Sequence, residues 1–88
     1  MPSTTNKPQL SVIARAPFHV YYEGEALAVS ASNSVGPFDI LPGHADFFSI
    51  LDPGEVIIDN GTDEPMTFEI TNGIAAVKND EVMLFVNI

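Results

Sequence analysis

The sequence contains no cysteine, and only three of its 88 residues are lysine or arginine. The absence of cysteine excludes disulfide frameworks, thiolate zinc sites and cysteine nucleophiles. Lys7, Arg15 and Lys78 are too few cations to displace the counterions of a nucleic acid. The twelve acidic residues bring the formal charge to −9, which should repel anionic lipid surfaces and favours a basic protein partner. Alternatively, the acidic residues serve only to keep the protein soluble.

Long apolar segments are also missing. No stretch approaches the length of a membrane span, and no window of eleven or more residues combines helical periodicity with helix caps. Residues 1–9 are polar, contain two prolines and do not resemble a signal peptide. We therefore expect a flexible tail over residues 1–9 and one domain over residues 10–88. A domain this small buries only about 60% of its unfolded surface, so it gains from a partner.

Short apolar runs with a period of two fill the rest of the chain. On a strand this spacing gives each run one side that faces the core. Eight or nine such runs with regular turns favour an all-β sandwich or flattened barrel. The residues expected in the core are Val12, Val20, Leu27, Val29, Leu51, Val56, Phe68, Ile70, Val82 and Leu84.

Four turn signals separate the runs. Leu41–His44 and Asp52–Glu55 each place proline and glycine at the centre of a four-residue turn, the arrangement of a type II turn. Asn60-Gly61 suits a tight hairpin. The polar stretch Lys78–Glu81 predicts a hairpin between the last two strands.

His44 and Asp46 are the residues most able to carry chemistry, as metal ligands or as a base and its orienting partner. A metal site needs three or four protein ligands, and no catalytic or phosphate-binding motif is present. The simpler interpretation is that both side chains bond to nearby backbone. His19 is expected on a strand surface rather than in a site. We therefore expect no catalytic residue, no metal and no cofactor.

Five blocks in order resemble the epsilon subunit of F-type ATP synthases. Ile40-Leu41-Pro42-Gly43-His44-Ala45 matches the family's signature I-L-P-G-H-A without a break. The other blocks are residues 22–26, 50–56, 67–74 and 79–84, which are similar to F-S-G-E, L-x-P-G-x-V, F-x-V-S-G-G-F and N-x-V-T-V-L. The resemblance covers about residues 10–88.

The resemblance implies a sandwich of about ten antiparallel strands in a non-catalytic subunit of the central stalk. That subunit packs on the gamma subunit and on the membrane rotor ring (the c-ring), on the cytoplasmic face of the membrane as part of the peripheral F1 sector. In the family a C-terminal helical hairpin follows and in some members binds ATP. The sequence has no such hairpin before Ile88, which implies an excised domain or a short relative, and no ATP binding.

Some positions depart from the family pattern. Pro37 stands where the family has an acidic residue, Asp39 where it has glycine, and Asn72-Gly73 where it has paired glycines. An upstream proline–glycine pair is Asn33-Ser34 here. Pro37 and Asp39 belong to the loop that the resemblance directs toward the ring.

Two contact surfaces follow from the resemblance and the apolar pattern. Apolar residues on faces opposite the core should contact gamma, because interface cores favour aromatic residues and methionine. The alternatives to a rotor subunit are a free-standing binding module on the same fold and, with less support, a small hydrolase or metal protein. The expected ring-contact residues are Asp39, Pro42, Gly43, His44 and Asp46, and the expected gamma-contact residues are Phe48, Ile50, Met83 and Phe85.

Overall fold

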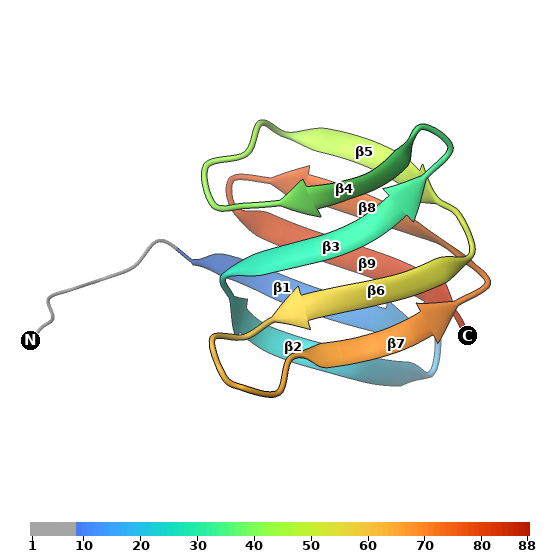
Figure 1. The fold of residues 1–88 in the computed structure, drawn as a ribbon, viewed down its shortest axis with the longest axis horizontal. Coiled ribbons are helices and arrows are strands. Elements are labelled where there is room, and N and C mark those ends of the chain that lie inside the picture. The colour runs from blue at the N-terminus through green and yellow to red at the C-terminus, as the bar shows by residue number, and fades with distance from the viewer. Residues whose placement is uncertain (1–8) are drawn as a thin grey trace, which may run out of the picture.

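The computed structural model describes residues 9–88, which form nine strands and contain no helix (Figure 1). In this part of the chain there is accordingly no helix that could cross a membrane. The predicted tail, residues 1–9, lies outside the described residues except for Gln9. The strands are β1 (Leu10–Ala16), β2 (His19–Ala26), β3 (Ala28–Asn33), β4 (Gly36–Ile40), β5 (Phe47–Leu51), β6 (Gly54–Asp59), β7 (Met66–Ile70), β8 (Asn72–Lys78) and β9 (Glu81–Asn87).

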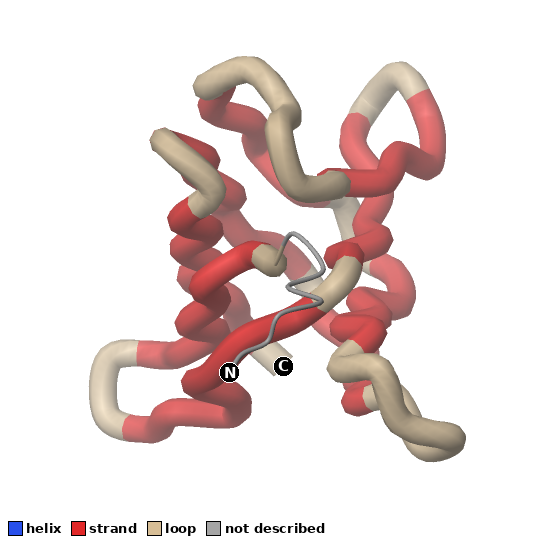
Figure 2. The backbone as a smooth tube through the Cα atoms, turned by 90° about the vertical axis from the view of Figure 1, so that its left-hand side faces the viewer, coloured by secondary structure: helices blue, strands red, loops and turns tan. Residues whose placement is uncertain are grey.

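The nine strands form two sheets that pack face to face, as Figure 2 shows nearly end-on. One sheet has five strands in the order β2-β1-β9-β8-β5, and the other has four in the order β4-β3-β6-β7. The predicted all-β sandwich is thus confirmed, with nine described strands rather than about ten. One pair departs from the antiparallel expectation: β1 runs parallel to β9, with Val12 beside Val82 and Ala14 beside Leu84.

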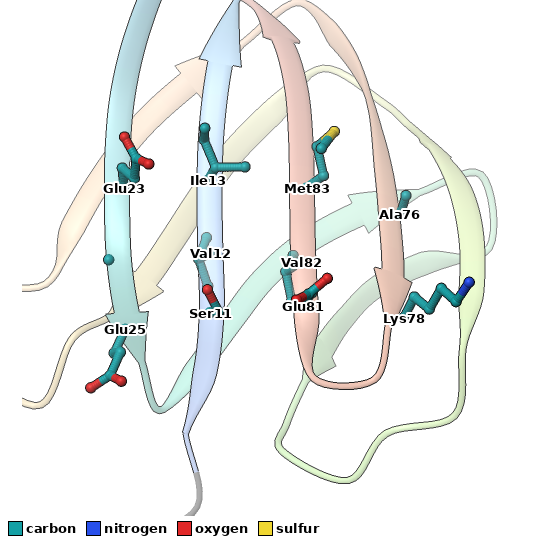
Figure 3. Close-up of a pocket in the computed structure, with 11 residues that line it drawn as sticks. Ser11, Val12, Ile13, Glu23, Glu25, Ala76, Lys78, Glu81, Val82 and Met83 are labelled. Atoms are coloured by element: carbon teal, nitrogen blue, oxygen red, sulfur yellow. The ribbon is translucent and has the colours of Figure 1, made fainter.

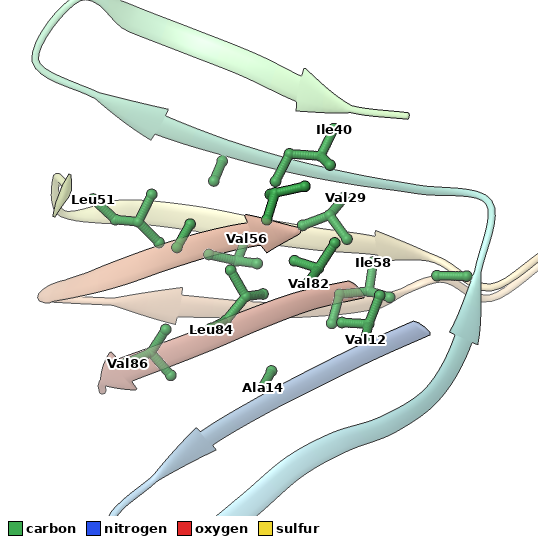
Figure 4. Packing of buried hydrophobic residues seen from close by; sticks show 14 of the residues in the cluster. Val12, Ala14, Val29, Ile40, Leu51, Val56, Ile58, Val82, Leu84 and Val86 are labelled. Atoms are coloured by element: carbon green, nitrogen blue, oxygen red, sulfur yellow. The ribbon is translucent and has the colours of Figure 1, made fainter. Parts of the chain in front are cut away.

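The core lies between the sheets and is entirely apolar over the described residues (Figure 4). Alternate residues of each strand point into it, as expected from the pleat. Val29 and Ile58 of the four-stranded sheet meet Val12 and Val82 of the five-stranded one. Seven of the predicted core residues are buried: Val12, Val29, Leu51, Val56, Ile70, Val82 and Leu84.

The core prediction is wrong for Val20, which is 41% exposed. Ala14 pairs with Tyr22 and Arg15 with Val20, so Tyr21 has no partner on β1. An extra residue of this kind is a β-bulge, which reverses the alternation beyond it. Val20 therefore faces outward, while Tyr21 stacks on Phe68 of β7 with 5.6 Å between ring centroids.

Two other predicted core residues are only half-buried. Leu27 lies at the bend between β2 and β3 rather than within a strand. Phe68 packs against the edge of the core beside Tyr21 instead of being enclosed by it. Both still contribute apolar contacts, but neither has the full burial that the period-two pattern predicts.

The turn predictions are correct for two of the four segments. His44 N donates to Leu41 O at 3.1 Å, and Gly43 has φ +84°, as a type II turn requires. Lys78 pairs with Glu81 across a two-residue turn in which Asn79 and Asp80 have positive φ.

The other two predicted turns have different structures. Residues 52–53 cross from β5 in one sheet to β6 in the other, and Gly54 opens β6 with φ +152°, which is not the value of a type II turn. Asn60-Gly61 belongs to a six-residue loop between β6 and β7, not to a tight hairpin. Asp59 and Asn60 shape that loop by accepting hydrogen bonds from the amides of Gly61 and Thr62.

Candidate protein-binding surfaces

The two outer faces of the sandwich differ in polarity. The outer face of the four-stranded sheet carries Ser30 and Asp39, whose side chains share a hydrogen bond of 2.7 Å. Glu55 and Glu69 lie directly opposite each other on β6 and β7. Like charges in this position repel and are tolerated because both side chains are exposed. This face is polar and acidic, as solvent-facing sheets usually are.

The outer face of the five-stranded sheet is largely apolar in its centre. The pairing registers align its outward residues in two rows across the strands. One row runs from Phe48 through Ala76 and Met83 to Ile13, and the other runs from Ile50 through Ile74, Phe85 and Arg15 to Val20. We call the eight apolar residues of these two rows the apolar face; Arg15 is the one charged residue in the two rows.

The predicted gamma-contact residues Phe48, Ile50, Met83 and Phe85 all lie on this face. Phe48 is 66% exposed and Ile50 68% exposed, whereas side chains of this size are usually buried. The sequence analysis did not select the other four members, Ile13, Val20, Ile74 and Ala76. Three of them could have been found from the alternation, because each lies one residue from a buried position.

A shallow hollow lies on this side of the sheet between β2, β1, β9 and β8 (Figure 3). Ile13, Met83 and Ala76 line its apolar part. Toward the start of β9, the next row of outward residues is mostly charged and contains Glu25, Ser11, Glu81 and Lys78. Glu23 of β2 lies beside Ile13 of β1. The apolar face is therefore bordered at one end by charged side chains, most of them acidic.

The loop that joins β4 to β5, residues 41–46, crosses from one sheet to the other. The loop begins with the Leu41–His44 turn. His44 Nδ1 lies 2.8 Å from the Ala45 carbonyl oxygen, to which it donates a hydrogen bond when Nδ1 is protonated. The His44 ring also contacts Phe47, with centroids 4.9 Å apart, and Phe47 packs edge-on against Phe38 at 5.9 Å. The exposed part of the loop is thus held on a half-buried aromatic pair.

The structure brings four of the five predicted ring-contact residues together. Pro42, Gly43, His44 and Asp46 lie in the 41–46 loop, and all but half-buried Pro42 are exposed. Asp39 is separate: it lies within β4 on the outer face of the four-stranded sheet and accepts a hydrogen bond from Ser30.

Two carboxylates tie this loop to the β8–β9 turn. Asp46 Oδ1 accepts from the Asn79 amide at 3.0 Å, and Asp80 Oδ1 accepts from the Gly43 amide at 2.7 Å. Asp46 and Asn79 are far apart in sequence, so the hydrogen bond between them could not be predicted from the sequence. His44 therefore bonds to nearby backbone, as the simpler interpretation expected, whereas Asp46 bonds to a backbone amide that is distant in sequence.

Between residues 9 and 88 no three His, Asp or Glu side chains cluster closely enough to hold a metal ion. His19 is exposed on β2, with its ring 4.5 Å from that of Tyr21, in the surface position expected from the sequence.

Large apolar patches on a protein surface mark interaction sites, so an all-β sandwich with one apolar and one acidic outer face defines the class of candidate protein-binding domains. The chain belongs to the family of ATP synthase Delta/Epsilon chain β-sandwich domains, which matches residues 9–88. The suspected resemblance is thereby confirmed.

Curated relatives agree with this assignment. Over 66 residues the chain is 33% identical to the ATP synthase epsilon chains of Xanthomonas campestris pv. campestris and Xanthomonas oryzae pv. oryzae. These alignments cover 75% of this chain and 47% of each relative. The chain spans about half the length of the curated relatives it matches.

Solved structures share the fold at lower sequence identity. A chain of the Euglena gracilis mitochondrial ATP synthase, in a structure of OSCP, F1 and c-ring, superimposes with a TM-score of 0.83 at 16% identity, covering 97% of this chain and 54% of that one. A chain from the central stalk and c-ring of the Tetrahymena thermophila mitochondrial ATP synthase gives 0.78 at 19% identity, covering 96% and 67%.

Proposed function

We propose that this chain is a non-catalytic rotor domain of a proton- or sodium-translocating F-type ATP synthase, where it links the gamma subunit to the c-ring and couples rotation to ATP synthesis. The observation that supports the proposal is the exposed apolar face. It lies on a domain that belongs to the ATP synthase Delta/Epsilon chain family. In this role the domain transmits force and performs no chemistry.

The apolar face is the surface that meets gamma. Burying Phe48, Ile50 and Phe85 would remove large exposed side chains from water, and apolar burial contributes about 25 cal/mol per Å². The acidic border formed by Glu25 and Glu81 selects a partner surface with lysine or arginine at the matching edge, because complementary charge sets orientation and speeds association.

The 41–46 loop is the surface that meets the ring. Pro42 and Gly43 fix the turn, and His44 is the exposed side chain at its tip that is available for contact. Asp39, on the neighbouring strand β4, gives a second polar contact at the same end of the molecule. The working site is the cytoplasmic face of the membrane, in the peripheral F1 sector.

Co-purification tests the proposal. A tagged copy of the chain is expressed together with the gamma and c subunits encoded in the same genome, and the captured material is analysed after mild detergent extraction. We expect gamma and the c-ring to be retained. Retention of neither subunit would contradict the proposal and favour a free-standing binding module.

A further inference from the structure

The two hydrogen bonds between the 41–46 loop and the β8–β9 turn form a reciprocal pair. A carboxylate of the loop, Asp46, accepts from the turn, and a carboxylate of the turn, Asp80, accepts from the loop. Hydrogen bonds to charged acceptors are roughly twice as strong as neutral ones. Both bonds join segments more than thirty residues apart in the chain. We call them the two staples.

The staples attach the loop to one sheet in particular. By sequence the loop connects the two sheets, since β4 belongs to the four-stranded sheet and β5 to the five-stranded one. The turn that receives both staples joins β8 and β9, which lie within the five-stranded sheet. The Asp80 carbonyl oxygen also accepts from the Ser11 amide at 2.8 Å, which fixes the turn to β1.

The same hairpin presents the centre of the apolar face. Ile74 and Ala76 lie on β8, and Met83 and Phe85 lie on β9. One hairpin therefore carries four of the eight residues of the apolar face, including Met83 and Phe85, and at its turn holds the loop proposed to meet the ring. Figure 1 shows the loop between β4 and β5 at the same end of the molecule as the β8–β9 turn.

We propose that the β8–β9 hairpin is the element that transmits force between the two partner surfaces, with Asp46 and Asp80 as positioning residues that make the loop move with the five-stranded sheet. This inference rests on the proposed function. In this arrangement Asp46 holds the loop in place, and neighbouring residues such as His44 make the contact with the ring.

The variants separate the lost hydrogen bond from other effects. Asp80 has φ +62°, so Asp80→Gly removes the acceptor without the backbone strain that alanine would add. Asp46→Ala removes the other acceptor. Asp46→Asn and Asp80→Asn retain an acceptor oxygen and should restore most of the behaviour. Asp59→Ala is the matched control, because Asp59 also accepts from a glycine amide but within a loop of the four-stranded sheet.

Amide hydrogen exchange, measured by NMR in the 88-residue chain, tests the two staples directly through the exchange rates of the Gly43 and Asn79 amides. Asp80→Gly should speed exchange of the Gly43 amide by about tenfold, and Asp46→Ala should do the same for Asn79, as expected on losing a hydrogen bond to a charged acceptor. The asparagine variants should exchange nearly as the parent chain does, and Asp59→Ala should leave both amides unchanged. Unchanged exchange in Asp80→Gly and Asp46→Ala would overturn the inference.

Ion pumping per ATP hydrolysed, measured in vesicles for the ion that the parent complex transports, tests the mechanical consequence in the assembled complex. The Asp46→Ala/Asp80→Gly variant should lose pumping while gamma binding stays at the parent level, and the asparagine variants should recover pumping. Full pumping in the double variant, or an equal loss of gamma binding, would overturn the inference and leave the proposed function standing. Failure of the parent chain to bind gamma and the ring would overturn both.

Discussion

Gly73 shows at the scale of single residues how tightly this sandwich is built. It is buried in β8, and a Cβ atom placed on it would lie 2.6 Å from the Phe85 carbonyl oxygen and 3.1 Å from Val86 Cγ1. A backbone oxygen cannot move away as the end of a flexible side chain can. The position therefore requires glycine for close approach of two strands rather than for an unusual φ.

Gly73→Ala should accordingly destabilise the domain by about 1–3 kcal/mol, the usual cost of overpacking. Gly24→Ala is the control, since a Cβ there would meet its nearest atom, the Tyr22 hydroxyl, at an ordinary 3.6 Å. We expect that variant to stay within about 1 kcal/mol of the parent chain. Urea unfolding followed by circular dichroism measures both, and equal stability of the two variants would contradict the packing described for β8.

At this scale the sequence predicts burial well and partners poorly. Val12, Val82 and Leu84 could be placed in the core because their alternation is uninterrupted. Val20 could not, because the bulge at Tyr21 leaves no local signal in the sequence. The bonds of Asp46 and Asp80 depend on a loop and a turn that meet only after folding, so the sequence shows the carboxylates but not what they hold.

At the scale of elements, β9 displays the two environments of the sheet most clearly. Val82, Leu84 and Val86 point into the core, while Met83 and Phe85 point outward on the apolar face. Neighbouring residues on one strand thus differ in burial: the inward set forms the core, and the outward set is exposed.

Leu84→Ala should therefore lower the free energy of unfolding by about 2–5 kcal/mol, because it leaves a cavity at a fully buried position. Met83→Ala, one residue away and half exposed, should change it by less than about 1 kcal/mol. Thermal unfolding of the two variants side by side tests this. A comparable loss in Met83→Ala would mean that the outer face contributes to the core.

The element boundaries were predictable where apolar runs are continuous and not elsewhere. The sequence places Pro37 and Asp39 in a loop, because both residues interrupt the apolar pattern by which a strand is recognised, but they lie in β4 (Gly36–Ile40). Proline is tolerated there because β4 is an edge strand, which leaves one side without ladder bonds. The parallel β1–β9 pair could not be predicted either, since it joins the two ends of the domain.

At the scale of the whole molecule, charge and apolar surface are distributed unevenly. The net charge of −9 is compatible with the polar face of the four-stranded sheet and with the acidic border of the apolar face. The composition predicts the sign of this charge and its preference for basic partners. Which face is apolar follows only from the register of the five strands, which aligns outward residues from distant parts of the chain.

The same charge bears on nucleotide binding. Over residues 9–88 no helix offers an N-terminus to a phosphate, and acidic side chains repel polyphosphate. We predict that isothermal titration calorimetry with ATP and magnesium will detect no micromolar binding to the 88-residue chain. A saturable micromolar isotherm would contradict this prediction.

The most direct test of the central claim is the affinity of the chain for the gamma subunit after Phe48 and Phe85 are both replaced by serine. If the apolar face binds gamma, the dissociation constant should rise about a hundredfold, since interface aromatics contribute disproportionately, while the melting temperature stays close to that of the parent. Val35→Ser, which removes an exposed apolar side chain at the β3–β4 turn, and His44→Ala should leave gamma binding unchanged. Unaltered affinity in the double variant, or its unfolding, would contradict the account.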